Sequence, residues 1–258
     1  MQVKTMAELQ AEGKVPELLF WVGCAGSFDA RAIKISKAFV NILNKAGISF
    51  AILGEEESCC GDPARRAGNE FVFQMLALQN IEVMKMYDVK HIVTTCPHGY
   101  NTLKNEYPQL GGEFKVQHHS QYLLELLEKG KIKLRDKKLD VLLSYHDSCY
   151  MGRVNEEYDA PRKVLKEISN KTKEVKRSKS KGFCCGAGGA QMFKEEENGS
   201  ARVNNNRAKE FIDADCGIIA VNCPFCTTML EDGLKEYNKE EEIKVMDLAE
   251  LLSDQIED

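Results

Sequence analysis

The chain lacks the features that direct a protein into or across a membrane. None of its apolar runs approaches the eighteen residues that a membrane-spanning helix requires. The segment from Met1 to Trp21 contains acidic side chains and lacks the apolar stretch of a signal peptide. We therefore expect a cytoplasmic protein with no membrane span of its own.

The chain also lacks an excess of basic residues. Its 258 residues include 35 Lys and Arg against 40 Asp and Glu, a formal net charge of −5, which argues against nucleic acid as a partner. With 43% hydrophobic residues it can bury an ordinary core without disulfide bonds. Ten cysteines in such a protein predict metal binding or catalysis in a reducing compartment.

Nine of the ten cysteines follow one pattern that occurs twice. In each half, a single cysteine is followed after 34 residues by Cys-Cys-Gly, and later by Cys-Pro. The repeat predicts a duplicated thiolate-ligand unit, with residues 1–134 as the first unit and 135–258 as the second. The candidate metal ligands are Cys24, Cys59, Cys60 and Cys96 in the first unit, and Cys149, Cys184, Cys185, Cys223 and Cys226 in the second.

The hydrophobic pattern predicts an α/β fold. Short apolar runs alternate with segments of helical periodicity, as expected for two pseudo-repeated units of parallel β-sheet flanked by helices. Four of the repeated cysteines lie at the ends of predicted strands, so the cluster sites should lie at the carboxyl ends of strands. The predicted strands are 18–23, 50–54, 91–95, 139–145 and 218–222, with a weak one at 174–175; helices are predicted around 35–46, 63–87 and 202–214.

The pattern also predicts one buried helix face and one exposed loop. The helix predicted over 63–87 carries Phe71, Met75, Leu78 and Ile81 on one face. Residues 195–197, three consecutive glutamates, are expected in an exposed loop.

The residues beside the cysteines have a physical reason to be there. Gly61 and Gly186 allow the bend that adjacent cysteines need to serve one site, and they let a cluster and its sulfides approach the backbone N–H groups. We therefore predict both glycines as cofactor-binding residues. Pro97 and Pro224 suit the first position of a helix, whose dipole would lower the pKa of the preceding thiol.

Several alternatives remain for the metal. Cys223-x-x-Cys226 alone is typical of a redox dithiol or half a zinc site, and four thiolates can hold structural zinc. The second unit offers five thiolates, however, and soft ligands in that number favour an iron–sulfur cluster. Cys216 lies roughly 23 Å from Cys223 along an extended strand, so we expect it to be a buried core thiol.

The doubled Cys-Cys-Gly and Cys-Pro-x-Cys signature resembles the cysteine-rich domain pair of heterodisulfide reductase, in its B-type subunit and in the C-terminal part of its D-type subunit. Similar pairs occur in the iron–sulfur subunits of glycolate, lactate and glycerol-3-phosphate oxidising systems. The resemblance runs from about Leu18 to Leu252. It implies a [4Fe-4S] cluster, noncubane in the second unit, and a second iron–sulfur cluster in the first unit. In the second unit it implies these ligands: Cys149, Cys184, Cys185, Cys223 and Cys226.

The first unit departs from the family pattern because Gly99 stands where the second unit has Cys226. Four thiolates remain, enough for a conventional four-iron cluster. His98 is a candidate substitute ligand, although its counterpart Phe225 cannot bind a metal. Since heterodisulfide cleavage in the family uses two facing clusters, this departure favours electron relay.

The resemblance thus implies an iron–sulfur electron-transfer subunit of an oxidoreductase complex. Its partners would be a ferredoxin-type subunit or a flavoprotein donor and a small-molecule or quinone acceptor, with association with a membrane complex left open. The alternatives are a heterodisulfide reductase catalytic subunit and a zinc-stabilised scaffold. No Cys-x2-Cys-x2-Cys-x3-Cys run is present, so a ferredoxin module should lie on a separate chain.

Other residues have two interpretations each, and none is assigned a catalytic role. The basic segment 171–181 is a solvated loop or a docking patch for an acidic partner. His118, His119 and His146 tune or gate protons to a cluster, or they have structural roles.

Overall fold

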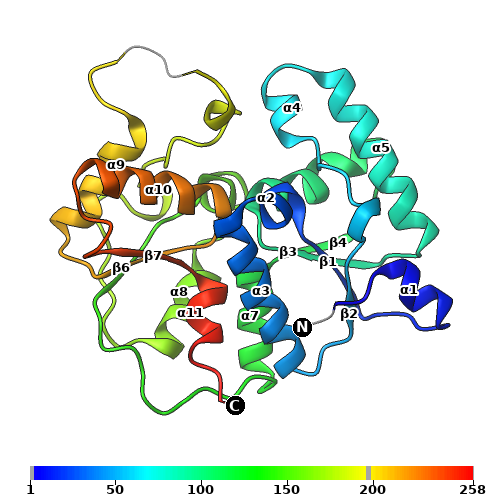
Figure 1. Ribbon diagram of the computed structural model, residues 1–258, viewed down its shortest axis with the longest axis horizontal. Helices are drawn as coiled ribbons and strands as arrows, with labels where there is room; N and C mark the ends of the chain where they lie inside the picture. Colours follow the sequence, from blue (N-terminus) through cyan, green and yellow to red (C-terminus); the bar gives the residue numbers. More distant parts are fainter. Residues whose placement is uncertain (1–2, 196–198, 258) are drawn as a thin grey trace.

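The computed structural model describes residues 3–195 and 199–257, and it contains a parallel β-sheet in each half of the chain (Figure 1). The first sheet has the strand order β2-β1-β3-β4 and the second β5-β6-β7. This confirms the predicted α/β class with two pseudo-repeated units. Glu196 and Glu197, expected in an exposed loop, lie outside the described residues. The strands are β1 (Leu18–Trp21), β2 (Phe50–Ala51), β3 (His91–Thr94), β4 (Lys115–His118), β5 (Leu143–Tyr145), β6 (Ile218–Val221) and β7 (Lys244–Asp247).

Helices connect the strands and flank both sheets. The α-helices are α1 (Met6–Ala11), α2 (Gly23–Phe28), α3 (Ala30–Lys45), α4 (Asp62–Arg66), α5 (Glu70–Met86), α6 (Pro97–Asn101), α7 (His119–Glu128), α8 (Asp159–Ile168), α9 (Val203–Asp213), α10 (Pro224–Glu236) and α11 (Leu248–Ser253). Short π-helical segments are η2 (Thr102–Glu106) and η4 (Tyr150–Val154), and short 3-10 segments are η1 (Gly54–Glu56), η3 (Tyr107–Leu110), η5 (Lys179–Lys181) and η6 (Gln191–Phe193).

The two sheets repeat one pairing scheme. In the first half β3 pairs with β1 and β4, and in the second half β6 pairs with β5 and β7. The pairing of β2 with β1 has only a reduced counterpart, in isolated bridges that join residues 139 to 169 and 143 to 172. The predicted strand 139–145 is therefore shorter than expected. The prediction of a strand at 174–175 was wrong, because the pairing in this segment is an isolated bridge at residue 172.

The strongest predicted elements form for the expected reasons. All residues of β1 and β6 are buried, as in parallel strands that helices cover on both faces. In α3, the Asp29 side chain caps the helix by accepting the Ala32 N–H at 2.7 Å, and the apolar residues at three- and four-residue spacing are buried. Gly47, with φ +67°, follows the end of the helix.

The single long helix predicted over 63–87 was wrong in two respects. It is broken into α4 and α5 at Gly68, whose φ of +88° ends the first helix, and the Asn69 side chain caps the second. Phe71, Met75 and Leu78 are 73%, 53% and 46% exposed. The helix instead buries a neighbouring face, because it also carries apolar side chains there: Phe73, Ala77, Ile81 and Met84.

The two halves share a hydrophobic core. Helices α3, α7, α8 and α11 lie between the sheets (Figure 1), and one buried cluster contains side chains from strands of both, among them Phe20 and Ala220. Polar contacts also cross between the halves. Arg31 on α3 forms ion pairs of 2.7 Å with Glu231 and Glu250. The two sets of cysteine loops are consequently held side by side.

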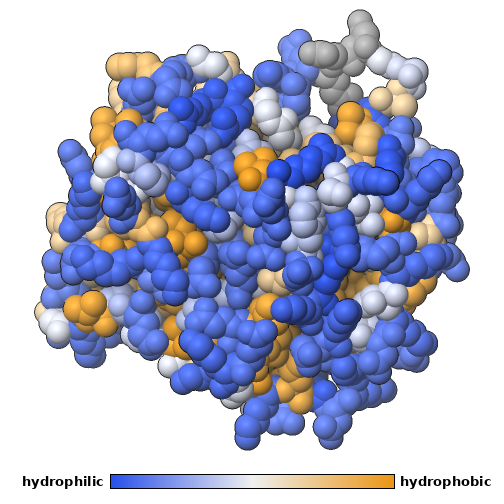
Figure 2. Space-filling model, turned by 180° about the vertical axis from the view of Figure 1, so that it is seen from behind, coloured by the Kyte–Doolittle hydropathy of each residue, from blue (hydrophilic) through white to orange (hydrophobic). Residues whose placement is uncertain are grey.

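No helix among the described residues is both long and apolar enough to cross a membrane. On the face opposite to that of Figure 1, hydrophobic side chains occur in separate small groups on a mostly hydrophilic surface (Figure 2).

Candidate functional site

Four of the repeated cysteines lie just beyond the carboxyl ends of strands, as predicted. Cys24 follows β1 and Cys149 follows β5. Cys96 and Cys223 are the residues that precede helices α6 and α10, so that Pro97 and Pro224 occupy the first helical positions. The shared topology of the two sheets therefore delivers single cysteines to equivalent places.

The adjacent cysteines stand on turns that require glycine. Gly61 and Gly186 have φ of +89° and +95°, and a Cβ at Gly61 would lie only 2.8 Å from the Phe73 ring. The N–H of Gly61 donates to Cys59 Sγ at 3.5 Å, and the N–H of Gly186 donates to Cys184 Sγ at 3.2 Å. Each turn thus presents one thiol to a backbone donor and buries the next, in Cys60 and Cys185.

The five cysteines of the second half converge on one place. The Sγ atoms of Cys185 and Cys226 are 3.3 Å apart, and the thiol of Cys226 also makes a hydrogen bond with that of Cys223. The thiol of Cys184 makes hydrogen bonds with those of Cys149 and Cys185. A ring nitrogen of His146 lies within 4.8 Å of the sulfurs of Cys185 and Cys226.

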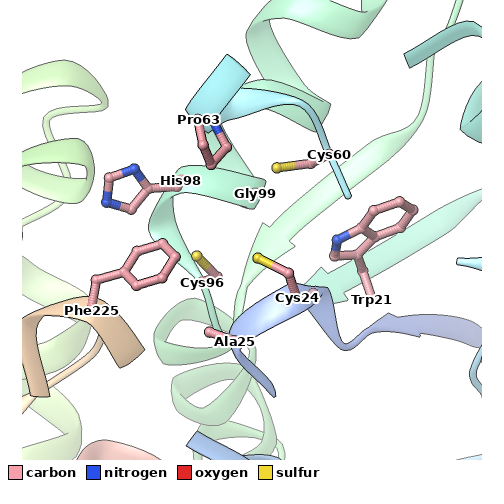
Figure 3. A pocket seen from close by; sticks show the side chains of 10 residues that line it. Trp21, Cys24, Ala25, Cys60, Pro63, Cys96, His98, Gly99 and Phe225 are labelled. Atoms are coloured by element: carbon pink, nitrogen blue, oxygen red, sulfur yellow. The ribbon is translucent and has the colours of Figure 1, made fainter. Parts of the chain in front are cut away.

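The first half gathers four cysteines in the same way. Cys24, Cys60 and Cys96 line one pocket, together with Trp21 and Gly99, and Figure 3 shows their three sulfurs pointing into it. The remaining thiol, that of Cys59, makes hydrogen bonds with those of Cys24 and Cys60.

The thiols of each half differ in acidity in the same order. Hydrogen bonds from Cys24 and Cys60 lower the pKa of Cys59 to about 3. The equivalent bonds from Cys149 and Cys185 lower the pKa of Cys184 to about 2. In turn, hydrogen bonding to these groups raises the pKa values of Cys24 and Cys149. Negative charge is therefore best stabilised on the first member of each Cys-Cys pair.

Of the two thiols expected to be made more acidic by helix dipoles, only Cys223 has a lowered pKa, and the main groups that lower it are side chains. Burial raises the pKa of Cys223, but hydrogen bonds from Cys226 and His98 outweigh it and lower the value to about 5. Burial dominates at Cys96, whose pKa is raised. The physical reason is that Cys96 has Gly99 in place of a thiol donor.

His98 reaches towards the second half and does not point at Cys24 or Cys60 (Figure 3). Its Nδ1 bonds to Asp62 Oδ2 at 2.9 Å, and its side chain bonds to Cys223. Burial lowers the pKa of His98, but the bonds to Asp62 and Cys223 raise it to about 9. The imidazole is thus tied to a carboxylate and to a cysteine of the other half.

The two groups of cysteines are neighbours. The charge of Cys223 raises the pKa of Cys96, and a Cβ on Gly188 would lie 4.0 Å from both Cys149 Sγ and the His98 ring. Phe225 from the second half lines the pocket of the first, and its ring packs edge-on against that of His98 at 5.1 Å. His98 and Phe225 occupy equivalent sequence positions, so each half contributes a ring to a wall between the two sites.

Three residues at the sites were missed from the sequence. Glu57 accepts the backbone N–H groups of Val22 and Gly23, which shape the Cys24 loop, and its burial raises its pKa to about 7. Asp62 accepts hydrogen bonds from His98, Tyr150 and Arg66. Arg207 is fully buried beside His146. The sequence offered a signal only for the two acidic residues, which flank the first Cys-Cys pair, and nothing marked Arg207.

His118, His119 and Cys216 are buried. His118 bonds to the backbones of Thr95 and Asn222, which precede Cys96 and Cys223, and His119 bonds to Asp247 at 2.9 Å. These two histidines therefore link the halves. Cys216 is buried in the core and donates to the Phe211 carbonyl at 3.4 Å, as expected for a core thiol.

The basic segment 171–181 is partly used within the molecule. Lys173 donates to the Ala214 carbonyl, and Arg177 pairs with Glu210 and stacks on Phe183. Lys176, Lys179 and Lys181 are exposed.

Comparison with solved structures identifies a similar fold in a hypothetical protein from Helicobacter pylori. The TM-score is 0.57 at 10% sequence identity, over 91% of this chain and 48% of that chain. At this identity the likeness concerns the fold alone.

Curated relatives cover nearly the whole chain. It is 48% identical over 97% of its length to the EtfAB:quinone oxidoreductase of Syntrophomonas wolfei, and 46% identical over 99% to the probable iron-sulfur-binding oxidoreductase FadF of Bacillus subtilis. It is 33% identical over 92% to the D-type subunit of the dihydromethanophenazine:CoB–CoM heterodisulfide reductase of Methanosarcina barkeri. The chain spans 36% of the first two proteins and 58% of the third.

The model of the cysteine-rich domain family matches the chain twice, over residues 18–104 and 143–231. The two matches contain the two groups of converging cysteines. The chain belongs to the cysteine-rich domain family.

Proposed function

We propose that this chain is an iron–sulfur electron-transfer subunit of an oxidoreductase complex. The observation that carries the proposal is the convergence of nine thiols into two adjacent groups at the carboxyl ends of parallel strands. Relatives named as iron–sulfur and quinone oxidoreductases, similar over nearly the whole chain, support it.

The second group of cysteines fits an iron–sulfur cluster better than zinc. Five thiols exceed the four ligands of a structural zinc site. Among the described residues, buried polar atoms without a partner also lie beside the cysteines, namely His146 Nε2, Ser148 Oγ and Asn222 Nδ2. A cluster with its own sulfides would give such atoms hydrogen-bond acceptors. We assign a [4Fe-4S] cluster there, noncubane by resemblance to the family, with the ligands Cys149, Cys184, Cys185, Cys223 and Cys226.

The first group fits a second iron–sulfur cluster with a smaller ligand set. Four thiols suffice for a conventional four-iron cluster. Its proposed ligands are Cys24, Cys59, Cys60 and Cys96, with no ligand from His98, which is bound to Asp62 and faces the other half.

An iron–sulfur cluster, when bound, accepts and donates single electrons. The chain supplies the conditions for that chemistry. Gly61 and Gly186 direct N–H groups at the thiolates, which offsets negative charge at the sulfur atoms. His98 and Phe225 fill the space between the two groups with rings. Because the two groups of cysteines are neighbours, electrons can pass from one group to the other over a short separation.

The chain spans about a third of the quinone oxidoreductase and of FadF. We propose a ferredoxin-type subunit or a flavoprotein as electron donor, and a quinone or small molecule as acceptor. The exposed lysines at 176, 179 and 181 are a candidate docking patch for an acidic donor. We place the complex in the cytoplasm or at the cytoplasmic side of a membrane.

A second function is heterodisulfide reduction, and one observation favours it. A small pocket between the two groups is lined by residues of both halves, including Asp62, His98, Ala187 and Phe225. His98 there holds a proton beside Cys223, which is where a departing thiolate would need one.

The first experiment is to measure iron and acid-labile sulfide per chain in protein purified without air. About eight irons would support two four-iron clusters, and about four would support a single cluster in the second half. Zinc without iron would exclude both functions proposed above. Turnover of a heterodisulfide by the loaded chain alone would favour the reductase over the relay.

A further inference from the structure

His146 is a fully buried histidine beside the second group of cysteines, and its ring is bonded on one side only among the described residues. Its Nδ1 accepts a hydrogen bond from Arg207 Nε at 3.0 Å. Its Nε2 has no partner in the part of the chain that the structure describes, and one of its ring nitrogens lies within 4.8 Å of the sulfurs of Cys185 and Cys226.

The contact with Arg207 decides which ring nitrogen carries the proton. A guanidinium group donates hydrogen bonds and does not accept them, so Nδ1 must present its lone pair to Arg207. The proton of the neutral ring is then on Nε2. A protonated imidazole nitrogen has no lone pair with which to bind a metal, so the free side of the ring is a donor.

Arg207 is itself held in place. Its Nη1 donates to the carbonyl of Arg177 at 2.9 Å and pairs with Glu210. Its side chain is fully buried against Phe211, with the guanidinium carbon 4.5 Å from the ring centre. The Arg207 side chain is therefore held by Arg177, Glu210 and the Phe211 ring. Its Nε–H points at His146.

A buried N–H without an acceptor is energetically unfavourable, because the group gives up its hydrogen bond to water. The sulfurs of Cys185 and Cys226 lie close enough to the His146 ring to share a cluster site with it. Sulfur atoms of a cluster accept N–H hydrogen bonds, and such bonds are among the factors that set cluster reduction potentials.

The first half repeats this arrangement with another donor. Trp21 lies three residues before Cys24, as His146 lies three residues before Cys149. The indole N–H is a donor only. Trp21 lines the pocket of Cys24 and Cys60, and Figure 3 shows its nitrogen on the side of the ring that faces their sulfurs.

We propose that His146 is a non-ligating hydrogen-bond donor to the sulfur atoms of the second cluster, with its donor nitrogen selected by Arg207. Trp21 has the equivalent role in the first half. The inference rests on the proposed function, since it assumes that an iron–sulfur cluster occupies the second site. It adds a pair of residues that set the reduction potential without binding iron.

The test uses the loaded chain with His146→Leu, His146→Gln and the matched control Trp21→Phe. Iron content is measured first, and the reduction potential of each cluster is followed by anaerobic titration with electron paramagnetic resonance. We expect His146→Leu to keep its iron and to shift the second cluster to a more negative potential, because the reduced cluster loses a donor. His146→Gln, which restores an N–H, should reverse part of the shift, and Trp21→Phe should leave the second cluster unchanged.

Pulsed paramagnetic resonance on protein labelled with nitrogen-15 histidine gives an independent measure. A weak histidine nitrogen coupling is expected, and it should vanish in His146→Leu. A strong coupling from a directly bound nitrogen, together with loss of iron in His146→Leu, would show a ligand and overturn the inference. An unchanged potential in His146→Leu with no histidine nitrogen coupling in the unaltered chain would overturn it as well. If the unaltered chain binds no iron, the proposed function itself fails.

Discussion

The two halves of the molecule carry the repeated cysteines at equivalent strand ends of similar sheets, yet they offer different sites. The second half gathers five thiols beside a histidine, and the first gathers four beside a tryptophan and Gly99. Within the described residues, buried polar atoms that lack a partner stand next to the cysteines of the second site, in His146, Ser148 and Asn222. The comparison teaches that a duplicated scaffold can preserve strand ends and turns while single residues change what each site can hold.

Removing the first member of a Cys-Cys pair should have the largest effect. Cys184→Ser should lose the cluster of the second half, about four irons per chain, since this thiol carries the most stabilised charge there. Cys59→Ser is the matched variant and should empty the first half only. Iron analysis and paramagnetic resonance measure both. Full iron and unchanged spectra in Cys184→Ser would refute the ligand assignment.

Converting the second site into a copy of the first should have the next largest effect. Cys226→Gly leaves four thiols, as in the first half, and removes the sulfur 3.3 Å from that of Cys185. We expect iron to be retained and the spectrum of the second cluster to approach that of the first. The glycine, within α10, should also lower the stability of the protein by about 1 kcal/mol. Spectra that do not change would mean that Cys226 is not a ligand.

The reverse conversion should have a smaller effect. A Cβ at Gly99 would lie 3.7 Å from Thr94 Oγ1 and 3.8 Å from the Trp21 ring, which is ordinary contact distance, so Gly99→Cys should fold. The variant should shift the spectrum of the first cluster towards that of the second, or raise iron content where the first site is only partly filled. Gly99→Ser is the control of similar size without a thiolate. Equal behaviour of the two variants would argue against a missing fifth ligand.

The smallest effect is expected at the cysteine outside the repeat. Cys216→Ser should leave iron and spectra of both clusters unchanged and lower the free energy of unfolding by about 1 kcal/mol, because it places a hydroxyl in an apolar core. Chemical denaturation and iron analysis test this. Loss of iron in this variant would identify Cys216 as a ligand of the second half that has no counterpart in the first half.

Much of the fold followed from local pattern. Buried parallel strands such as β6 are continuous apolar runs, and Pro97 and Pro224 mark where helices begin. Where two apolar faces competed, periodicity failed. The exposed Phe71 on α5 is the clearest case, since only packing decides which face of a helix is covered.

The duplication, the strand ends that carry single cysteines, and the need for Gly61 and Gly186 at the turns all follow from the order of the amino acids. Spacing along the chain and local backbone preference are enough for these. The tertiary structure decided what depends on residues far apart in the chain. Examples are the turn of His98 towards Cys223, the ring wall with Phe225, and the bond of Arg207 to His146. Hydrogen bonds and burial act across space, so the acidity of each thiol and the donor beside each site depend on residues far apart in the chain, and at Cys223 on residues of both halves.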